Sequence, residues 1–279
     1  MKRYMNGKDL YITEYNSVGE FVADINSLQP NKYYKDRSLS SQDKEDNDNG
    51  WHASRDYARA VYMVTNGWDS AAEKMASKVK MTNGMSSVVR TSKPTYGMVG
   101  SQASVPRYLQ GIPTNMVSRQ TTYSKQKVIT ITKGISYSAR WSSEAIIQEA
   151  IKALQIIQSM ENGGQRVRLN VMLATSENNK HSVCKVCVKQ PDERLNISKM
   201  AFALAHPAML RRFFFKWIEC DPFIDFDLGY AYGTPSALPI KERAMAESEY
   251  YIPEKIEDIN EFIKQLQSGK SRKTPPKHV

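Results

Sequence analysis

The chain has 279 residues, of which 41% are hydrophobic and 24% charged, and this composition is that of a folded globular protein with one large domain or a main domain and an appendage. It contains no run of ~18 apolar residues, and no apolar stretch follows the cations of its first residues, so we expect neither a membrane span nor a secretory signal peptide. Its 39 Lys and Arg exceed its 29 Asp and Glu, which gives a formal net charge of +10 and favours an anionic partner.

The N-terminal segment, residues 1–35, predicts a strand followed by a helix. Residues 10–13 combine aromatic and β-branched side chains, as strands do. Ser17 and Glu20 then have the spacing of a capping box, and apolar residues recur at helical spacing behind them. Residues 36–50 hold a single large apolar residue and predict an acidic flexible linker.

Residues 51–120 predict a helical hairpin followed by an irregular basic region. The apolar period of a helix runs on both sides of Asn66-Gly67, so we expect two helices joined at this corner. Most such corners are packing units, and a DNA-reading helix-turn-helix is the alternative. Residues 81–120 are rich in Gly, Ser, Thr and Pro, and we expect ordered but irregular loops there.

Residues 121–266 predict an α/β domain. A strand over 128–132 precedes a helix over 144–160 with a broad apolar face. Strands over 167–173 and 183–188 then form a hairpin. The rest of the chain predicts a helix from Ser198, a second helix that begins at Pro207, a strand at 250–252, an amphipathic helix at 256–266 and a basic disordered tail at 267–279.

The stretch HSVCKVCVKQ places Cys184 and Cys187 three residues apart, close to His181. Side chains alternate across a strand, so residues three apart point to opposite faces and cannot bind one metal together. The only other cysteine is Cys220, so a zinc ribbon would lack its second pair. We therefore expect the pair to be structural, and the low cysteine content is typical of a reducing, intracellular setting.

The segment from residue 74 to residue 140 contains eleven Lys and Arg and not one Asp or Glu. Nucleic acid is the commonest partner of such a segment, because phosphate neutralisation releases counterions, and the interleaved tyrosines could stack on unpaired bases. The alternative is internal, since residues 241–261 carry seven acids against three bases and could face these cations. The candidate residues for binding a partner or nucleic acid are Lys74, Lys78, Lys80, Arg90, Lys93, Arg107, Arg119, Lys125, Lys127, Lys133 and Arg140.

The order strand, helix, strand, strand over residues 128–188 resembles the start of a von Willebrand A domain. The resemblance implies an α/β fold with a von Willebrand A-like, Rossmann-type sheet, preceded here by an N-terminal helical and irregular region. In that family the loop after the first strand carries D-x-S-x-S and holds a divalent ion. Gly134, Ser136 and Ser138 occupy this loop, with glycine in place of the aspartate. The site is therefore interpreted as degenerate, and we expect no metal and no cofactor.

Four short segments also resemble, in order, an uncharacterised family of tailed-phage and prophage proteins. This resemblance covers residue 51 to about residue 253 and implies a viral origin and a host-cytoplasm setting, with virion association as an option. It supplies no catalytic residues. The segments are the helical hairpin at 51–68, VPRYLQGIP at 105–113, HPAMLRR at 206–212 and GYAYGTP at 229–235.

No Walker loop, GxSxG elbow, HExxH helix or GxGxxG turn is present, so we assign no catalytic residues. Asp225 and Asp227 form an unspecific D-x-D pair, and His206 is interpreted as a packing or helix-start residue. We expect a non-catalytic interaction or structural module that binds another protein through its α/β domain. A nucleic-acid-binding protein that uses residues 74–140 is the first alternative, and an unrecognised hydrolase is the second.

Overall fold

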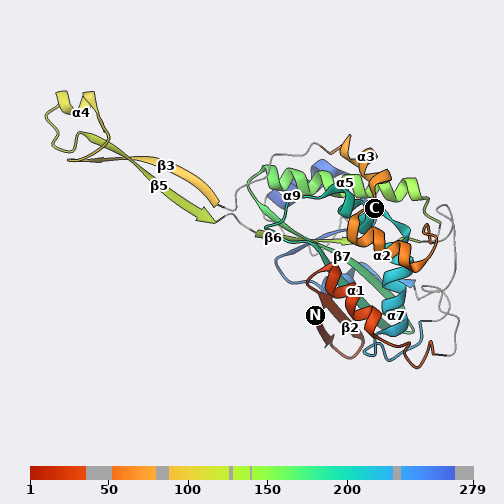
Figure 1. Ribbon diagram of the computed structural model, residues 1–279. Helices are drawn as coiled ribbons and strands as arrows, with labels where there is room; N and C mark the ends of the chain where they lie inside the picture. The colour runs from red at the N-terminus through yellow and green to blue at the C-terminus, as the bar shows by residue number, and fades with distance from the viewer. Residues whose placement is uncertain (36–51, 80–87, 126–127, 139, 229–233, 268–279) are drawn as a thin grey trace.

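The chain folds into a body built on a central β-sheet and an arm that projects away from it (Figure 1). The computed structural model describes residues 1–35, 52–79, 88–125, 128–138, 140–228 and 234–267. The arm comprises residues 88–125, and the body comprises the other described residues. The expected linker at 36–50 and nearly all of the expected tail at 267–279 lie outside this description.

The body contains a mixed sheet of seven strands in the order β1-β2-β8-β7-β6-β10, with β9 added on β7. Strand β6 runs parallel to β7 and β10, β7 and β8 pair antiparallel, and β2 runs parallel to β8. The expected mixed α/β fold is confirmed, as is the succession of strand, helix and hairpin. The strands are β1 (Lys2–Asn6), β2 (Leu10–Tyr15), β6 (Val128–Gly134), β7 (Arg166–Glu177), β8 (Lys180–Lys189), β9 (Thr234–Pro235) and β10 (Glu249–Ile252).

The longest helix, α5, connects β6 to β7 and packs its Ile, Ala, Leu and Met side chains into the core. Its start is fixed by Ser142, whose hydroxyl accepts a hydrogen bond from the Ala145 N–H at 3.2 Å. Within the described residues, no helix is long and apolar enough to cross a bilayer. The helices of the body are α1 (Val18–Ser27), α2 (Tyr57–Asn66), α3 (Asp69–Ala76), α5 (Ser143–Asn162), α6 (Ile197–Ala205), a π-helix (Met209–Phe214), α7 (Phe215–Cys220), α8 (Leu238–Arg243) and α9 (Ile259–Gln267).

One face of the sheet forms the main apolar core. Ile131 of β6, Leu169 of β7 and Cys184 of β8 belong to one cluster with buried residues of α1, α5 and α6. Cys184 shares this cluster with Val186 and Val188, as the alternation of a strand predicts. The main apolar core of the body therefore lies between this face of the sheet and the helices that cover it.

The opposite face of the sheet carries a buried polar network. The Glu249 carboxylate accepts hydrogen bonds from the Thr132 hydroxyl and, at 3.2 Å, from the Asn170 amide. The Lys185 ammonium lies 3.3 Å from the same carboxylate and 2.7 Å from Glu14. These groups satisfy one another inside the protein, so this face is a structural element of the sheet.

The predicted cap at the start of α1 is confirmed, with the reciprocal bond of Glu20 made one residue before the N-cap Ser17. The Ser17 hydroxyl accepts from the Glu20 N–H at 3.1 Å, and the Glu20 carboxylate accepts from the Asn16 N–H at 2.7 Å. The predicted corner between α2 and α3 is also present. Gly67 has a φ of +108°, and a Cβ there would lie 2.1 Å from the Ser198 hydroxyl oxygen, so only glycine fits where the corner packs on α6.

The helix expected from Pro207 is confirmed over residues 207–220, and its middle part is a π-helix that leads directly into α7. The π-helix widens the turn that carries Arg212, which is fully buried. Its guanidinium donates to the Ser54 hydroxyl at 2.7 Å and to the Ser54 carbonyl oxygen at 2.8 Å. Arg212 therefore anchors the segment that precedes α2.

The arm contradicts the expectation of irregular loops at 81–120. Strands β3 (Val88–Gly97) and β5 (Met116–Lys125) pair antiparallel over ten residues, β4 (Gln102–Ala103) pairs on the other side of β5, and α4 (Val105–Leu109) lies at the end. A high Ser and Thr content suggests loops. An isolated ribbon can have the same composition, because β-branched residues favour its strands and neither of its faces has to pack on an apolar core. Pro94 fits because β3 is an edge strand.

Candidate interaction surfaces of the arm

The register of β3 and β5 fixes which residues of the arm share a face. The pairing runs from Val88 opposite Lys125 to Gly97 opposite Met116, without a shift. In antiparallel strands, opposite residues lie on the same face and successive residues alternate between faces. The arm is therefore a two-faced ribbon along its whole paired length.

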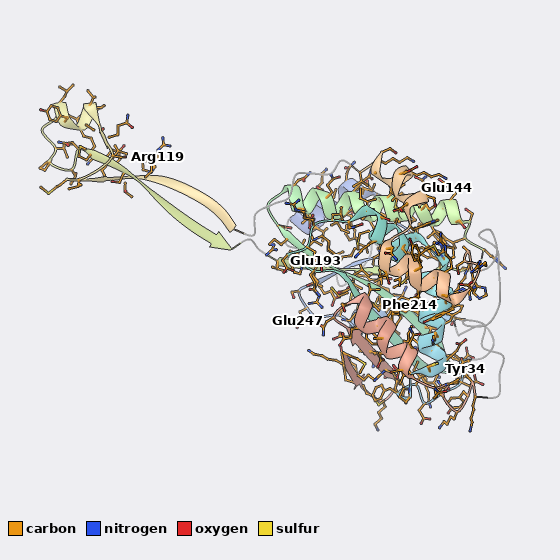
Figure 2. All side chains as sticks on the ribbon, in the orientation of Figure 1. Tyr34, Arg119, Glu144, Glu193, Phe214 and Glu247 are labelled. Atoms are coloured by element: carbon orange, nitrogen blue, oxygen red, sulfur yellow. The ribbon has the colours of Figure 1, made fainter. Side chains whose placement is uncertain are left out.

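Four of the five cations of the arm belong to one face, which we call the cationic face. The register places Arg90, Arg119 and Lys125 on it, opposite Tyr123, Pro94 and Val88 respectively. Arg107 of α4 joins this face, since its guanidinium carbon lies 4.2 Å from the ring centroid of Tyr96, whose position is on the same side. On the opposite face, Lys93 is the one charged position. Figure 2 shows Arg119 on the arm, away from the body.

The end of the arm is held in one shape by backbone hydrogen bonds. The Ser101 N–H donates to the Val117 carbonyl oxygen at 3.0 Å, and the Ser104 N–H donates to the Asn115 carbonyl oxygen at 2.7 Å. These two hydrogen bonds join the chain before α4 to the chain after it, at the start of β5. The side chains at this end are therefore presented by an ordered backbone.

This end also exposes large apolar side chains, and we call the group the apolar tip. A cluster of this kind on an otherwise polar surface is typical of a site that contacts another molecule. The side chains lie within twelve residues of sequence, so they form one group and are not scattered over the surface. Their exposed fractions are 76% for Met98, 85% for Val99, 64% for Val105, 67% for Tyr108 and 78% for Leu109.

The other candidate cations do not join the cationic face. Lys74, Lys78 and Arg140 are exposed on the body, and Lys133 is buried at the end of β6. The nine described cations thus divide between five on the arm and four at scattered positions of the body. Lys80 and Lys127 lie outside the described residues.

The acids of 241–261 offset one cation of the basic segment, because Glu254 lies beside the buried Lys133, but no ion pair between described residues joins them to the arm. Glu249 pairs with Lys185, and Glu254 pairs with Lys241 at 2.7 Å. Among the ion pairs between described residues, none joins these acids to a cation of 74–140. The arm therefore keeps its positive charge.

The loop that resembles a metal site is filled by the protein itself. The Ser136 hydroxyl bonds to both backbone groups of Ala174, at 3.2 and 3.3 Å. Ser138 is exposed and accepts from the Arg140 N–H at 3.4 Å. A Cβ on Gly134 would lie 2.3 Å from the Tyr251 hydroxyl oxygen and 2.7 Å from a Glu254 carboxylate oxygen. There is no space for an aspartate at this position.

Lys133 and Lys241 supply the positive charge around Glu254. The Lys133 ammonium donates to the carbonyl oxygens of Pro253 at 2.5 Å and of Glu254 at 3.0 Å. Burial lowers the pKa of Lys133 to about 7. The neighbouring Lys241 lowers the pKa of the Glu254 carboxyl against the opposite effect of burial. This cluster fixes the segment after β10 against β6.

The cysteines and His206 have structural environments. Cys184 and Cys187 are buried in β8, and burial raises the pKa of both thiols, so neither is an activated thiolate. His206 is buried between the rings of Phe202 and Trp68, at centroid distances of 4.9 and 4.5 Å. Its interpretation as a packing residue at a helix boundary is confirmed.

Ser176, His181 and Asp9 form the arrangement closest to a catalytic triad. The Ser176 hydroxyl oxygen lies 2.6 Å from His181 Nδ1, but His181 Nε2 lies 3.8 Å from the Asp9 carboxylate, which is beyond hydrogen-bond distance. Asp9 instead accepts two hydrogen bonds from Arg243, at 2.7 and 2.8 Å, and these lower its pKa to about 2. The imidazole thus lacks the orienting partner that a nucleophilic serine requires.

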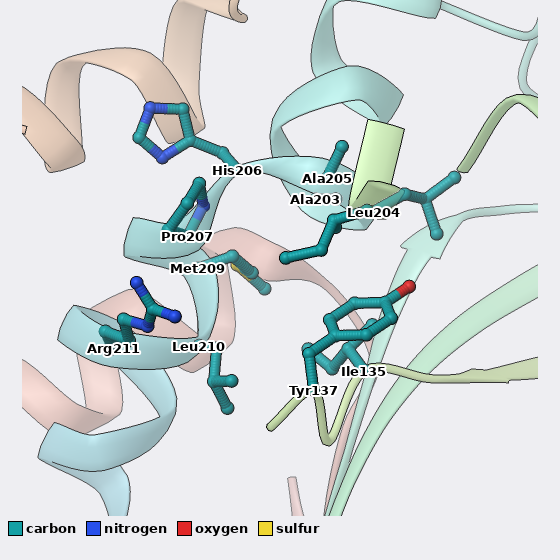
Figure 3. A pocket seen from close by; sticks show the side chains of 11 residues that line it. Ile135, Tyr137, Ala203, Leu204, Ala205, His206, Pro207, Met209, Leu210 and Arg211 are labelled. Atoms are coloured by element: carbon teal, nitrogen blue, oxygen red, sulfur yellow. The ribbon is translucent and has the colours of Figure 1, made fainter. Parts of the chain in front are cut away.

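Two hollows of the body differ in size. The smaller, about 10 Å³, lies between Tyr137, Leu204 and Met209 and is large enough for one water molecule. In Figure 3, His206 and Arg211 point away from the Tyr137 hydroxyl, so no group of polar side chains converges there. The larger, about 670 Å³, lies between α1, α2, α6 and the end of β8, where its floor is lined by Val18, Val22, Val64, Val188 and Met200.

Sequence reasoning found the charge of the arm but missed its two surfaces. Strand alternation over Val88–Gly97 and Met116–Lys125 could have separated the cations by face, had these stretches been predicted as strands. The apolar tip carries no sequence signal, because Met, Val and Leu in a loop-like stretch also fit a covered position. In the described part of the chain, no three His, Cys, Asp or Glu side chains gather as metal ligands would, and Asp225 pairs with Lys32.

Comparison with known proteins gives one match of nearly full length. No curated protein and no solved structure matches the chain. A family described as "Domain of unknown function (DUF7192)" matches residues 3–269, which include both the body and the arm. The chain therefore belongs to this family of unknown function.

Proposed function

We propose that the protein is a non-catalytic interaction module that docks on another protein through the apolar tip of its arm. The observation that carries the proposal is the exposure of five large apolar side chains on an ordered backbone. Burying such side chains in a partner's pocket is favourable by roughly 1.5–3 kcal/mol for each one that becomes fully covered. A few anchors of this kind are sufficient for a specific contact.

The body then acts as the base from which the arm is presented. The sequence favoured a contact through the α/β domain, whereas we assign the contact to the arm, because the polar face of the sheet is internally satisfied. A von Willebrand A-like origin is part of this proposal. The order β8-β7-β6-β10 with its antiparallel β7–β8 pair supports it, while β1 and β2 extend the sheet beyond β8. A tailed-phage origin rests on the short sequence resemblances alone.

The test compares a tip variant with a matched surface variant. In the tip variant, Val99, Val105 and Leu109 become Ser; in the control, the exposed body residues Tyr62 and Val128 become Ser. Affinity purification after chemical crosslinking, from cells that naturally make the protein, should recover one partner with the wild type and the control. The tip variant should recover at least tenfold less of it. All three proteins should unfold within about 0.5 kcal/mol of one another, because only exposed side chains change.

Equal recovery of the partner by the tip variant would refute the proposal. Sedimentation velocity identifies a second copy of the chain as the partner, if the wild type associates and the tip variant does not. Flotation of the wild type, but not the tip variant, with vesicles of anionic lipid would assign the tip to a membrane surface instead.

A further inference from the structure

We infer that the cationic face of the arm binds the phosphate backbone of nucleic acid. This function goes beyond docking through the tip, because it uses the side of the ribbon and different residues. The cationic face comprises Arg90, Arg107, Arg119 and Lys125.

The first argument is the asymmetry of charge between the two faces. Four cations share one face, and Lys93 is alone on the other. A linear anion that lies along one side of the ribbon would contact the positions of this face together.

The second argument is the lack of an internal counter-charge. No Asp or Glu occurs between Glu73 and Glu144, so the arm cannot neutralise itself. Arg119 is exposed, and the described residues place no carboxylate within ion-pair distance of Arg107 or Arg119. The exposed Arg119 is available to a ligand, and the half-buried Arg107, which donates to the Thr114 hydroxyl at 3.3 Å, adds its positive potential to the face.

The third argument is shape. Ten paired residues extend about 34 Å, which is close to one turn of duplex DNA, and a two-stranded ribbon is narrow enough for the ~12 Å major groove. Tyr96 and Tyr123 occupy positions on the same face. The Tyr96 ring is half exposed, with Arg107 over it, and offers a surface on which an unpaired base can stack. Phosphate contact is common to duplex and single strands, so both are tested.

The experiment is fluorescence anisotropy of labelled duplex and single-stranded DNA, and of single-stranded RNA, against the full chain from 50 to 200 mM salt. Four phosphate contacts give a slope of log affinity against log salt of about −3.6 for duplex and −2.8 for single strands. The affinity should therefore fall about 150-fold or about 50-fold across this range.

Variants on the two faces distinguish binding through the cationic face from an attraction that depends only on the net charge of the arm. Arg119→Gln should reduce the slope by about 0.9 on duplex, and Arg119→Lys should preserve it. Lys93→Gln removes the same charge from the opposite face and should leave the slope within error of the wild type. Arg119→Gln and Lys93→Gln leave the apolar tip intact, and the tip variant leaves the cationic face intact, so the two functions fail separately.

Absence of binding at 50 mM salt would overturn the inference, and the charge would then serve an acidic protein surface. Equal effects of Arg119→Gln and Lys93→Gln would also overturn it, because the attraction would not depend on the face. Tighter binding to duplex than to single strands at the same salt concentration assigns the ribbon to a groove, and the reverse assigns it to unpaired bases.

Discussion

Substitution of Gly134 by aspartate restores the D-x-S-x-S pattern in sequence and should fail to restore a metal site. The hypothetical Cβ at this position lies 2.3 Å from the Tyr251 hydroxyl oxygen and 2.7 Å from a Glu254 carboxylate oxygen. Both distances are far below van der Waals contact. An added side chain must therefore displace groups that are themselves bonded, since Tyr251 donates to Glu254 at 3.1 Å and Lys241 pairs with it at 2.7 Å.

The expected loss of stability has two parts. Overpacking by the new Cβ costs about 1–3 kcal/mol, and Gly134→Ala measures this part alone. The aspartate adds a second carboxylate beside Glu254 in a buried setting, which costs about 1–3 kcal/mol more for an unsatisfied charged group. Gly134→Asp should therefore lose roughly 2–6 kcal/mol, a large share of the 5–15 kcal/mol typical of a folded domain.

Urea unfolding followed by tryptophan fluorescence measures both variants, with and without 10 mM Mg²⁺. The free energy of unfolding of Gly134→Asp should not depend on Mg²⁺. A re-formed site with a Kd of 0.1 mM would raise it by about 2.7 kcal/mol at this concentration. The reasoning is refuted if Gly134→Asp is as stable as the wild type, or if Mg²⁺ stabilises it and not Gly134→Ala.

Three further predictions concern the body. Burial lowers the pKa of His206 to about 3, so on acidification the unfolded chain binds this proton first; stability falls as the pH drops below about 6.5, by about 2 kcal/mol at pH 5, and urea unfolding of His206→Asn should lack this loss. Burial lowers the pKa of Lys133 to about 7, so between pH 7 and 10.5 the unfolded chain keeps a proton on Lys133 that the folded chain has lost. The free energy of unfolding should therefore rise by up to about 1.4 kcal/mol per pH unit from pH 7.5 to 9. An equal rise in Lys133→Met would contradict this prediction. Ser17→Ala should lose about 1 kcal/mol in thermal unfolding through the α1 cap, whereas Ser27→Ala, at the other end of the helix, should lose less than half of that.

The body could be predicted from the sequence because its signals are local and agree with one another. The apolar period of α5, the capping box at Ser17 and the valine-rich hairpin that contains Cys184 each specify one element. Strand β1 escaped prediction, because Lys2–Asn6 carries an exposed, mostly polar sequence and is held by pairing with β2. Its Arg3 bonds to the buried Asp221 at 3.2 Å, a partner 218 residues away that no local pattern can indicate.

The arm could not be predicted in the same way, because the composition of a ribbon outside the core resembles that of a loop. The Ser, Thr, Gly and Pro content of 88–125 suggests turns, yet the Val, Thr and Tyr residues of both strands are also strand formers. The sequence shows how many cations the segment carries, but only the register of the strands shows on which face of the ribbon each one lies. The register then separates Arg119 from Lys93, which sequence counts treat alike.

The contrast between body and arm bears on where function lies. In the body, the buried charged groups are matched inside the protein, as Lys185 is by Glu14 and Glu249. In the arm, charged and apolar side chains stand exposed on a backbone that hydrogen bonds keep ordered. Exposed apolar side chains contribute little to the stability of the fold, and a group of them at the end of an ordered arm is the basis of the proposed docking site. The cationic face belongs to the same arm, so both proposed contacts are assigned to the arm and neither to the body.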